Sequence, residues 1–322
     1  MKTLFTLHLF LLSFLTLAAQ EGETVFTYLL LPTSARGAAL GGYNVSVVEN
    51  DLSLVHGNPA LLSPAMDMTV QAGYMSYVGD IGMGSATFGK AIGEKGAWGA
   101  GVIYANYGNM LETVDNQENI DALPTVIGNL NASDICTSVF FSHQLSEFFW
   151  GGVAAKFVYS NYFHNTAIGL GADLGINYYH PDTELSIGVV GKNLGRQVKA
   201  YEEELADLPW DIQIGMSQRL KHAPVRYSVS FINLNHWQKP LLRHLVIGLE
   251  LAPVENLWIA AGFNSKRASD FAITDGNKLA GFSIGAGIKV SYFSIGCAVG
   301  AYHPAAMSFL LNISTSLADF GL

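Results

Sequence analysis

The fold of this chain is decided by a stretch that reads IGLGADLGINY and runs from Ile168 to Tyr178. Apolar residues occupy every second position, and glycine, aspartate and asparagine occupy the positions between them. A period of two is that of a β-strand, because a helix would scatter both sets of residues around its axis. The stretch is therefore predicted to be a strand with one apolar face and one small or polar face.

The same alternation recurs from residue 66 onward. It predicts about fourteen strands of about ten residues, the length that crosses a hydrocarbon layer when a strand is tilted. The least regular strand is 81–91, because its phase slips near Ser85. The predicted strands are 66–74, 81–91, 98–104, 135–141, 149–159, 168–179, 185–189, 210–216, 225–231, 245–251, 257–263, 282–290, 293–301 and 307–315.

The connections between these strands are alternately short and long. Tight turns of a few residues, such as 93–96 and 180–183, separate the long connections, which are 106–132, 194–209, 234–243 and 264–278. Outer-membrane barrels have short turns on the periplasmic side and long loops outside the cell. An even number of strands also brings both chain ends to one side of the membrane.

The composition excludes several classes of protein. Only 13% of the residues are charged, against roughly 25% in soluble globular chains, and 34 of the 322 residues are glycine. The formal net charge of −9 argues against nucleic-acid binding, which usually requires a basic surface. Beyond the N-terminal region, no apolar run approaches the ~20 residues that a membrane helix needs.

A secreted soluble β-sandwich or propeller would show the same alternation. Its outward face would carry charge, whereas the non-apolar face here is mostly Gly, Ser, Ala and Asn. Aromatic residues also gather near predicted strand ends, as at Tyr77, Trp150 and Trp210, which is typical of interfacial girdles. The sequence therefore favours an all-β transmembrane barrel of about 14 antiparallel strands over residues 66–322, in the outer membrane of a Gram-negative bacterium.

Residues 1–19 are interpreted as a secretory signal peptide. Lys2 precedes an apolar run from Leu4 to Leu17, and small residues lead up to Ala19, near which we expect cleavage. A membrane anchor is the alternative, but the run is too short and lacks a basic flank on its far side. We therefore expect the chain to be exported.

No catalytic or metal site is predicted. Residues 281–285 match the G-x-S-x-G motif, but Ser283 lies in mid-strand instead of at a turn from strand into helix. Residues 84–91 resemble a phosphate-binding loop, but alanine replaces the Mg²⁺-binding hydroxyl and no helix follows. Cys136 and Cys297 fall on opposite faces of the predicted sheet and lack metal-ligand spacing. We expect neither enzymatic activity nor a cofactor.

Six charged residues fall in the polar phase of their strands and are predicted to point into the barrel lumen. There they would pair with one another or with a plug; ordinary solvation of the lumen is the alternative. These residues are Lys156, Asp173, Lys192, Arg226, Glu250 and Lys289. A barrel of this strand number would leak unless something occupied it.

Residues 20–65 are predicted to form that plug, because they lack the two-residue alternation. They contain a small-residue stretch at 35–42, and two prolines that restrict their neighbours and could steer the chain into the first strand. The residues expected to define the plug are Arg36, Gly41, Gly42, Asn58, Pro59 and Ala60.

The same segment carries a family resemblance. Residues 26–42, FTYLLLPTSARGAALGG, followed by Asn50-Asp51 and by NPALL at 58–62, resemble the PorV/PorQ family of the Bacteroidetes type IX secretion system. That family in turn resembles the long-chain fatty acid transporters, which are fourteen-stranded barrels with an N-terminal hatch and an Asn-Pro-Ala motif. The resemblance covers the N-terminal segment, while the remainder agrees in length and barrel pattern.

The resemblance implies a non-enzymatic anchor in the outer-membrane attachment complex of that secretion system. The implied partners are a PorZ-like surface protein, PorU, PorV, outer-membrane lipid and lipopolysaccharide. Docking would use acidic outer loops, which favour a basic partner, together with an apolar anchor. The expected docking residues are Glu112, Asp115, Glu118, Asp121, Glu202, Glu203, Glu204 and Trp237. Solvated loops with an interfacial tryptophan are the alternative.

A second hypothesis is an outer-membrane transporter or channel for a hydrophobic small molecule. It requires an apolar pocket inside the barrel. The inward phase, rich in Gly, Ser and Asn with Lys and Asp, offers little for a lipid tail, whereas Phe26 to Leu31 could line such a pocket. The sequence alone favours docking modestly over transport.

Overall fold

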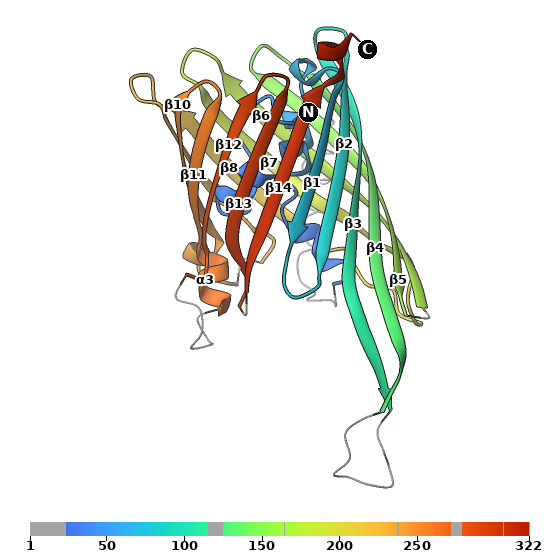
Figure 1. Ribbon diagram of the computed structural model, residues 1–322. Helices are drawn as coiled ribbons and strands as arrows, with labels where there is room; N and C mark the ends of the chain where they lie inside the picture. The colour runs from blue at the N-terminus through green and yellow to red at the C-terminus, as the bar shows by residue number, and fades with distance from the viewer. Residues whose placement is uncertain are drawn as a thin grey trace, which may run out of the picture.

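A computed structural model describes residues 24–114, 125–163, 165–236, 238–271, 279–304 and 306–321. Figure 1 shows a single barrel of tilted strands with the N-terminal part of the chain inside it. Within the described residues, no helix is long and apolar enough to span a membrane.

The strands form one closed antiparallel barrel. Each strand pairs with its neighbours in sequence, and β1 closes the barrel by pairing with β14, from Thr69 opposite Ser316 to Ser76 opposite Phe309. The predicted barrel of fourteen antiparallel strands is confirmed. The strands are β1 (Thr69–Ser76), β2 (Gly82–Ile92), β3 (Gly96–Val114), β4 (Thr125–Gln144), β5 (Phe149–Tyr162), β6 (Asn165–His180), β7 (Leu185–Lys199), β8 (Asp211–Arg219), β9 (Val225–Phe231), β10 (Leu245–Val254), β11 (Leu257–Asn264), β12 (Phe282–Val290), β13 (Phe293–His303) and β14 (Ala306–Ser316).

The predicted alternation of faces is also present. In β6, Leu174 is 52% exposed on the outer face, while Asp173 beside it is fully buried on the inner face. Cys136 is buried and Cys297 is exposed, so the two free cysteines lie on opposite faces of the wall. Exposed apolar side chains cover the outer face of the strands, which suits contact with lipid.

Some predicted boundaries are wrong. The first strand begins at Thr69 instead of at residue 66, and Met66 is buried in a 3-10 turn because the chain is still leaving the lumen there. Most of the predicted loop 106–132 is strand: β3 continues to Val114 and β4 starts at Thr125, so the two project past the loop end of the barrel (Figure 1). The predicted loop 194–209 likewise begins as strand, because β7 runs to Lys199.

The two ends of the barrel are named here by their connections. The turn end carries the short connections and the pair Thr69–Ser316, and the loop end carries the projecting β3–β4 hairpin, called the ribbon. A short helix, α3 (Ser265–Phe271), and a 3-10 turn, η5 (Leu241–His244), pack together at the loop end. A final 3-10 turn, η6 (Leu317–Phe320), follows β14 at the turn end.

Residues 24–66, the N-terminal segment, lie inside the barrel. The segment consists of short elements, which are η1 (Thr27–Leu30), α2 (Ala35–Ala39), η2 (Leu52–His56), η3 (Pro59–Leu61) and η4 (Pro64–Met66). Helix α2 packs on β11 to β14, whereas η3 packs on β4 to β6. The segment therefore bridges opposite parts of the wall, as the blue ribbon in Figure 1 shows. That it acts as a plug remains a prediction.

Inward-facing glycines allow the segment to approach the wall closely. Gly152 and Gly175 are paired across β5 and β6. A Cβ atom on Gly152 would overlap the backbone of Ala60, and one on Gly175 would overlap the side chain of Asn58. The Asn58 amide in turn donates to Val45 O at 2.8 Å and accepts from Ala60 N at 3.0 Å, so it orders the turn that sits on the two glycines.

The same close approach at β11 gives a testable prediction. A Cβ on Gly262 would overlap the backbone at Leu40 and Gly41, so Gly262→Leu should displace the segment and expose Arg36, whose side chain is only 11% exposed. We expect trypsin cleavage after Arg36 in detergent to accelerate at least about tenfold, a shift of about 1.4 kcal/mol in the opening equilibrium. The matched control is Gly84→Leu, whose Cβ would meet open space. Equal cleavage of both variants would contradict the docking of the segment on β11.

Candidate functional site in the barrel lumen

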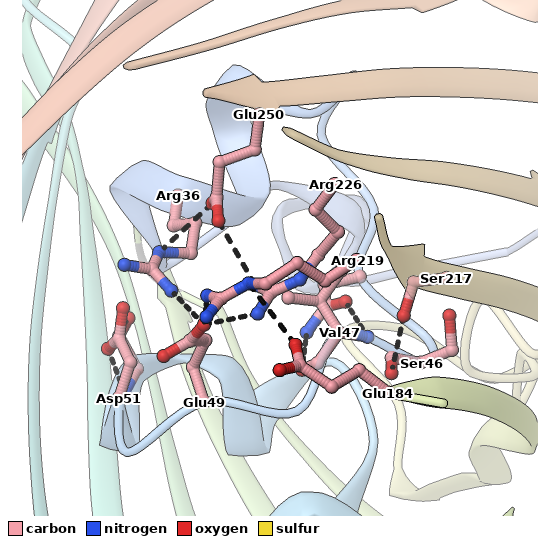
Figure 2. A network of polar contacts seen from close by, with 12 residues as sticks. Arg36, Ser46, Val47, Glu49, Asp51, Glu184, Ser217, Arg219, Arg226 and Glu250 are labelled. Carbon is pink, nitrogen blue, oxygen red and sulfur yellow. Dashed lines mark hydrogen bonds and ion pairs between the residues drawn. The ribbon is translucent and has the colours of Figure 1, made fainter. Parts of the chain in front are cut away.

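A cluster of charged side chains fastens the N-terminal segment to the wall near the turn end (Figure 2). Arg36 of α2 contacts Glu250 of β10 at 3.5 Å and Glu49 at 3.4 Å. Arg226 of β9 donates to Glu250 at 3.0 Å and also to Glu49. Arg219 of β8 donates to Glu49 at 3.0 Å. Two residues of the segment are thus held by three adjacent strands.

Burial makes this cluster energetically important. The Glu250 side chain is only 1% exposed, whereas Glu184 at the outer edge of the cluster is 42% exposed. Removing one partner of a buried ion pair typically costs 3–5 kcal/mol, because the remaining charge is left unpaired, while an exposed pair contributes about 0–1 kcal/mol. The attachment of the segment therefore depends on its buried members.

The cluster also sets the ionisation of Glu49. Burial opposes the charged form, but the guanidinium groups of Arg36, Arg226 and Arg219 outweigh it, so the pKa of Glu49 lies below its usual value. Arg36 shows the matching balance: burial opposes its charge, but Glu250 and Glu49 hold its pKa above the usual value. Both side chains are therefore charged at neutral pH.

A pH dependence follows from the lowered pKa of Glu49. A carboxylate with a lower pKa in the folded state contributes stability that is complete above its usual pKa and is lost as the pH falls through the folded pKa. The difference in unfolding free energy between wild type and Glu49→Gln should therefore stay constant from pH 7 to about 4.5 and shrink below it. Denaturant titrations in detergent at several pH values measure this difference. A difference that already disappears at pH 6 would contradict the lowered pKa.

A second buried pair lies further along the lumen. Lys156 Nζ of β5 lies 2.7 Å from Asp173 Oδ2 of β6, and it donates to Asn193 Oδ1 at 2.7 Å. Asp173 Oδ1 accepts from the backbone N–H of Asn193 at 2.7 Å. Asn193 has the left-handed backbone conformation, with φ of 53°, and donates to Pro209 O at 3.1 Å. The pair thus joins three strands with its polar atoms bonded.

His56 of the segment packs near this pair. Its Nε2 lies 2.8 Å from Thr87 Oγ1, and its ring meets Phe140 edge-on, with the ring centroids 5.0 Å apart. Burial, assisted by the positive charges of Lys156 and Lys192, lowers the pKa of His56 to about 3. The imidazole is therefore neutral at physiological pH and adds no charge to the lumen.

A third attachment involves the glycine turn after α2. Gly41 and Gly42 have φ values of 95° and 88°, which glycine adopts without strain. Gly41 N donates to Ser283 Oγ at 3.1 Å, and Gly41 O accepts from Asn264 Nδ2 and Arg267 Nη1, each at 3.1 Å. Arg267 also lies over the ring of Tyr302, 3.9 Å from its centroid. The loop-end helix α3 thereby contacts the segment directly.

Three cavities border the N-terminal segment. A loop-end cavity of about 180 Å³ is lined by Thr24 and Leu30 of the segment. A middle cavity of about 50 Å³ is lined by its residues from Leu29 to Ser34, and by Lys156, Lys192 and Gln213 of the wall. A turn-end cavity of about 240 Å³ is lined by Ala35 and Arg36, next along the segment. The segment therefore contributes to the lining of all three cavities.

The sequence-predicted residues fall into separate groups. Arg226 pairs with Glu250, which also contacts Arg36. Lys156 pairs with Asp173, and Lys192 lies beside that pair at the middle cavity. Lys289 is exposed and lines the turn-end cavity, apart from the other lumen charges. Of the docking residues, Glu202, Glu203 and Glu204 are exposed in the connection after β7, and Glu112 is half-buried on the ribbon. Asp115, Glu118, Asp121, Trp237 and the signal peptide 1–19 lie outside the described residues.

Three members of the turn-end cluster, Glu49, Arg219 and Glu184, were not predicted. Arg219 lies in the inward phase of β8, three residues past the predicted end at Met216, so extending the alternation would have found it. Glu49 belongs to a segment without regular period, and no local signal marks it. Within the described residues, no group of three or more His, Cys, Asp or Glu side chains could hold a metal ion.

Comparison with known proteins places this architecture among outer-membrane barrels. No family model matches the sequence, and no significant relative is found among curated proteins. The solved structure of the P. putida toluene transporter TodX is 12% identical and matches with a TM-score of 0.60, over 89% of this chain and 99% of that chain. The chain has the fold of an outer-membrane channel.

Two further structures agree with this assignment. The Ralstonia pickettii toluene transporter TbuX is 12% identical with a TM-score of 0.55, over 88% of this chain and 97% of that chain. The CymD monoaromatic hydrocarbon channel is 11% identical with a TM-score of 0.57, over 89% of this chain and 98% of that chain. At such low identity these similarities show the fold. The outer-membrane location and the lack of enzymatic activity stay predictions from the sequence.

Proposed function

We propose that the protein is an outer-membrane channel for a small molecule, held closed by its N-terminal segment. The observation that carries the proposal is that the segment lines three separate cavities, with Ser34 in the lining of the middle one and Ala35 and Arg36 in the lining of the turn-end one. We expect displacement of residues 34–36 to join the middle and turn-end cavities. The solved hydrocarbon transporters and channels with the same fold support transport as the role of such a barrel.

The cavity linings indicate the class of solute. The middle cavity has leucines from the segment on one side and Lys156, Lys192 and Gln213 of the wall on the other. The turn-end cavity is lined by charged and amide side chains, including Glu49, Asp51 and Lys289. A purely apolar molecule would shield these polar groups from water without bonding to them, at a cost in free energy. The solute that fits best has an apolar part and a polar group.

Uptake measurements test this proposal. Cells of a heterologous Gram-negative host that express the Glu250→Gln variant, in which the ion pairs that hold the segment are weakened, should take up labelled benzoate, a small aromatic acid, faster than cells with an empty vector. Uptake of a neutral sugar should be unchanged, because it lacks an apolar part to contact the leucine side. Equal uptake of both probes by expressing and control cells would contradict transport.

Docking of a surface protein is the second candidate, and the ribbon favours it. Beyond Asn106, β3 no longer pairs with β2, and before Ala132, β4 does not pair with β5. The ribbon therefore presents free strand edges. A segment of a partner protein could add a strand to such an edge through main-chain hydrogen bonds. Residues 106–132 contain acidic and no basic residues, so the partner would carry basic groups. This is the role of a type IX secretion anchor that binds a PorZ-like protein, with PorU, PorV and lipopolysaccharide nearby.

Affinity purification from outer membrane tests docking separately from transport. The tagged protein should retain a PorZ-like partner in detergent, and replacement of residues 107–131 by a two-residue turn should release it. The control is the triple variant Glu202→Gln/Glu203→Gln/Glu204→Gln. It removes negative charge from the connection after β7 and leaves the ribbon intact. A partner that stays bound to the shortened protein would contradict docking through the ribbon.

A further inference from the structure

The loop-end cavity is surrounded by cationic side chains, although the chain as a whole carries a net charge of −9. Its volume is about 180 Å³, and it lies between the β9–β10 connection, η5 and α3. Lys239, Arg243 and Lys266 line it together with two histidines, and Asp270 is the carboxylate in its lining. The electrostatic character of this cavity is therefore opposite to that of the whole protein.

Asp270 holds two of these cations side by side. Its Oδ1 lies 2.6 Å from Arg243 Nη2, and its Oδ2 lies 3.4 Å from Lys266 Nζ. One carboxylate faces three cationic side chains, so two positive charges of the lining are not balanced within it. Arg243 Nε is buried and has no hydrogen-bond partner among the described residues. Such a preordered arrangement of donors loses little entropy when an anion binds.

We propose that the loop-end cavity is a binding site for a phosphate group. A phosphate monoester carries about −1.5 to −2 charges at neutral pH and so matches the two unbalanced positive charges, whereas a carboxylate carries one. Its three oxygens can accept from the guanidinium and ammonium groups together. Leu30, Pro209 and Trp210 line the same cavity and would contact the organic part of the ligand.

Two sources share this chemistry, the phosphorylated headgroup of lipopolysaccharide and a soluble organic phosphate. Phosphate binding at this cavity does not depend on transport, because it does not require residues 34–36 of the segment to move. Binding and conduction can therefore be measured on the same protein, and failure of one leaves the other standing.

Calorimetric titration of the full-length protein in nonionic detergent with inorganic phosphate tests the site. Wild type should bind phosphate more tightly than acetate. Lys239→Gln/Lys266→Gln should weaken phosphate binding about 100-fold, since each charge-assisted hydrogen bond lost corresponds to about tenfold in affinity. Lys221→Gln, at the exposed turn between β8 and β9, should leave the affinity unchanged. Equal affinity for phosphate and acetate, or an unchanged affinity in the double variant, would overturn the proposal.

Vesicle binding separates the two sources. If the ligand is the headgroup, phosphatidylcholine vesicles that contain phosphorylated lipid A should retain the detergent-solubilised protein more strongly than vesicles that contain dephosphorylated lipid A. The double variant should then lose this preference. Phosphate binding without a preference between the vesicles assigns the site to a soluble phosphate. A vesicle preference that the double variant keeps would contradict headgroup binding at this cavity.

Discussion

Glu250→Gln should convert a barrel that is closed in planar bilayers into one with frequent openings. Glu250 is the most buried acid of the turn-end cluster, and it contacts both Arg36 on the segment and Arg226 on the wall. The substitution preserves shape but leaves these two guanidinium groups with Glu49 as their remaining shared carboxylate. Loss of about 3 kcal/mol would raise the population of the displaced segment by about two orders of magnitude.

Glu184→Gln is the matched control for this experiment. Glu184 belongs to the same cluster, but it pairs with Arg219 at 3.3 Å in a largely solvated position. An exposed pair contributes about 0–1 kcal/mol, so this variant should conduct like wild type. If Glu250→Gln remains as closed as Glu184→Gln, the cluster does not hold the segment in place.

Lys156→Met should strongly destabilise the barrel. It leaves the carboxylate of Asp173 buried, with exposure of 0%, and without its ion-pair partner. An unpaired buried charge typically costs 3–5 kcal/mol. The expected result is a lower denaturant midpoint for loss of tryptophan fluorescence in detergent micelles.

The double variant Lys156→Met/Asp173→Asn should recover most of that loss. It removes both charges, and the asparagine oxygen can still accept from the backbone N–H of Asn193, which Asp173 binds at 2.7 Å. Replacement of a buried ion pair by neutral groups is often close to neutral in stability. A double variant that is less stable than the single one would show that the pair itself, and not the unpaired charge, determines stability.

The barrel wall was predictable because lipid imposes the pattern. A residue such as Leu174 must face hydrocarbon and Asp173 must face the lumen, so the alternation is visible wherever a strand crosses the membrane. The ribbon was missed because residues 106–114 and 125–132 project beyond that environment, and no buried face enforces a period there. Their pairing depends on the partner strand, which single-strand periodicity does not reveal.

The candidate site was predictable only in part. Strand phase placed Arg226 and Glu250 on the inner face, but the partner of each depends on where the N-terminal segment folds, and Glu49 lies in a stretch without regular period. Gly152 and Gly175 were read only as small residues of a crowded interior, although their pairing marks the place where Asn58 docks. The inward glycines could thus have indicated where the wall is contacted closely, but not that the N-terminal segment makes this contact.

A reversible crosslink tests the central claim, that the N-terminal segment occupies the lumen and closes it. A Cβ on Gly296 of β13 would lie 3.3 Å from Ala35 Cβ, close to the separation in a disulfide. Ala35→Cys/Gly296→Cys is introduced together with Glu250→Gln, with Cys136 and Cys297 replaced by alanine to prevent mispairing. The predicted result is that oxidation forms the crosslink and abolishes the channel openings, and that reduction restores them. The same conductance before and after reduction, or failure of the crosslink to form, would contradict the claim.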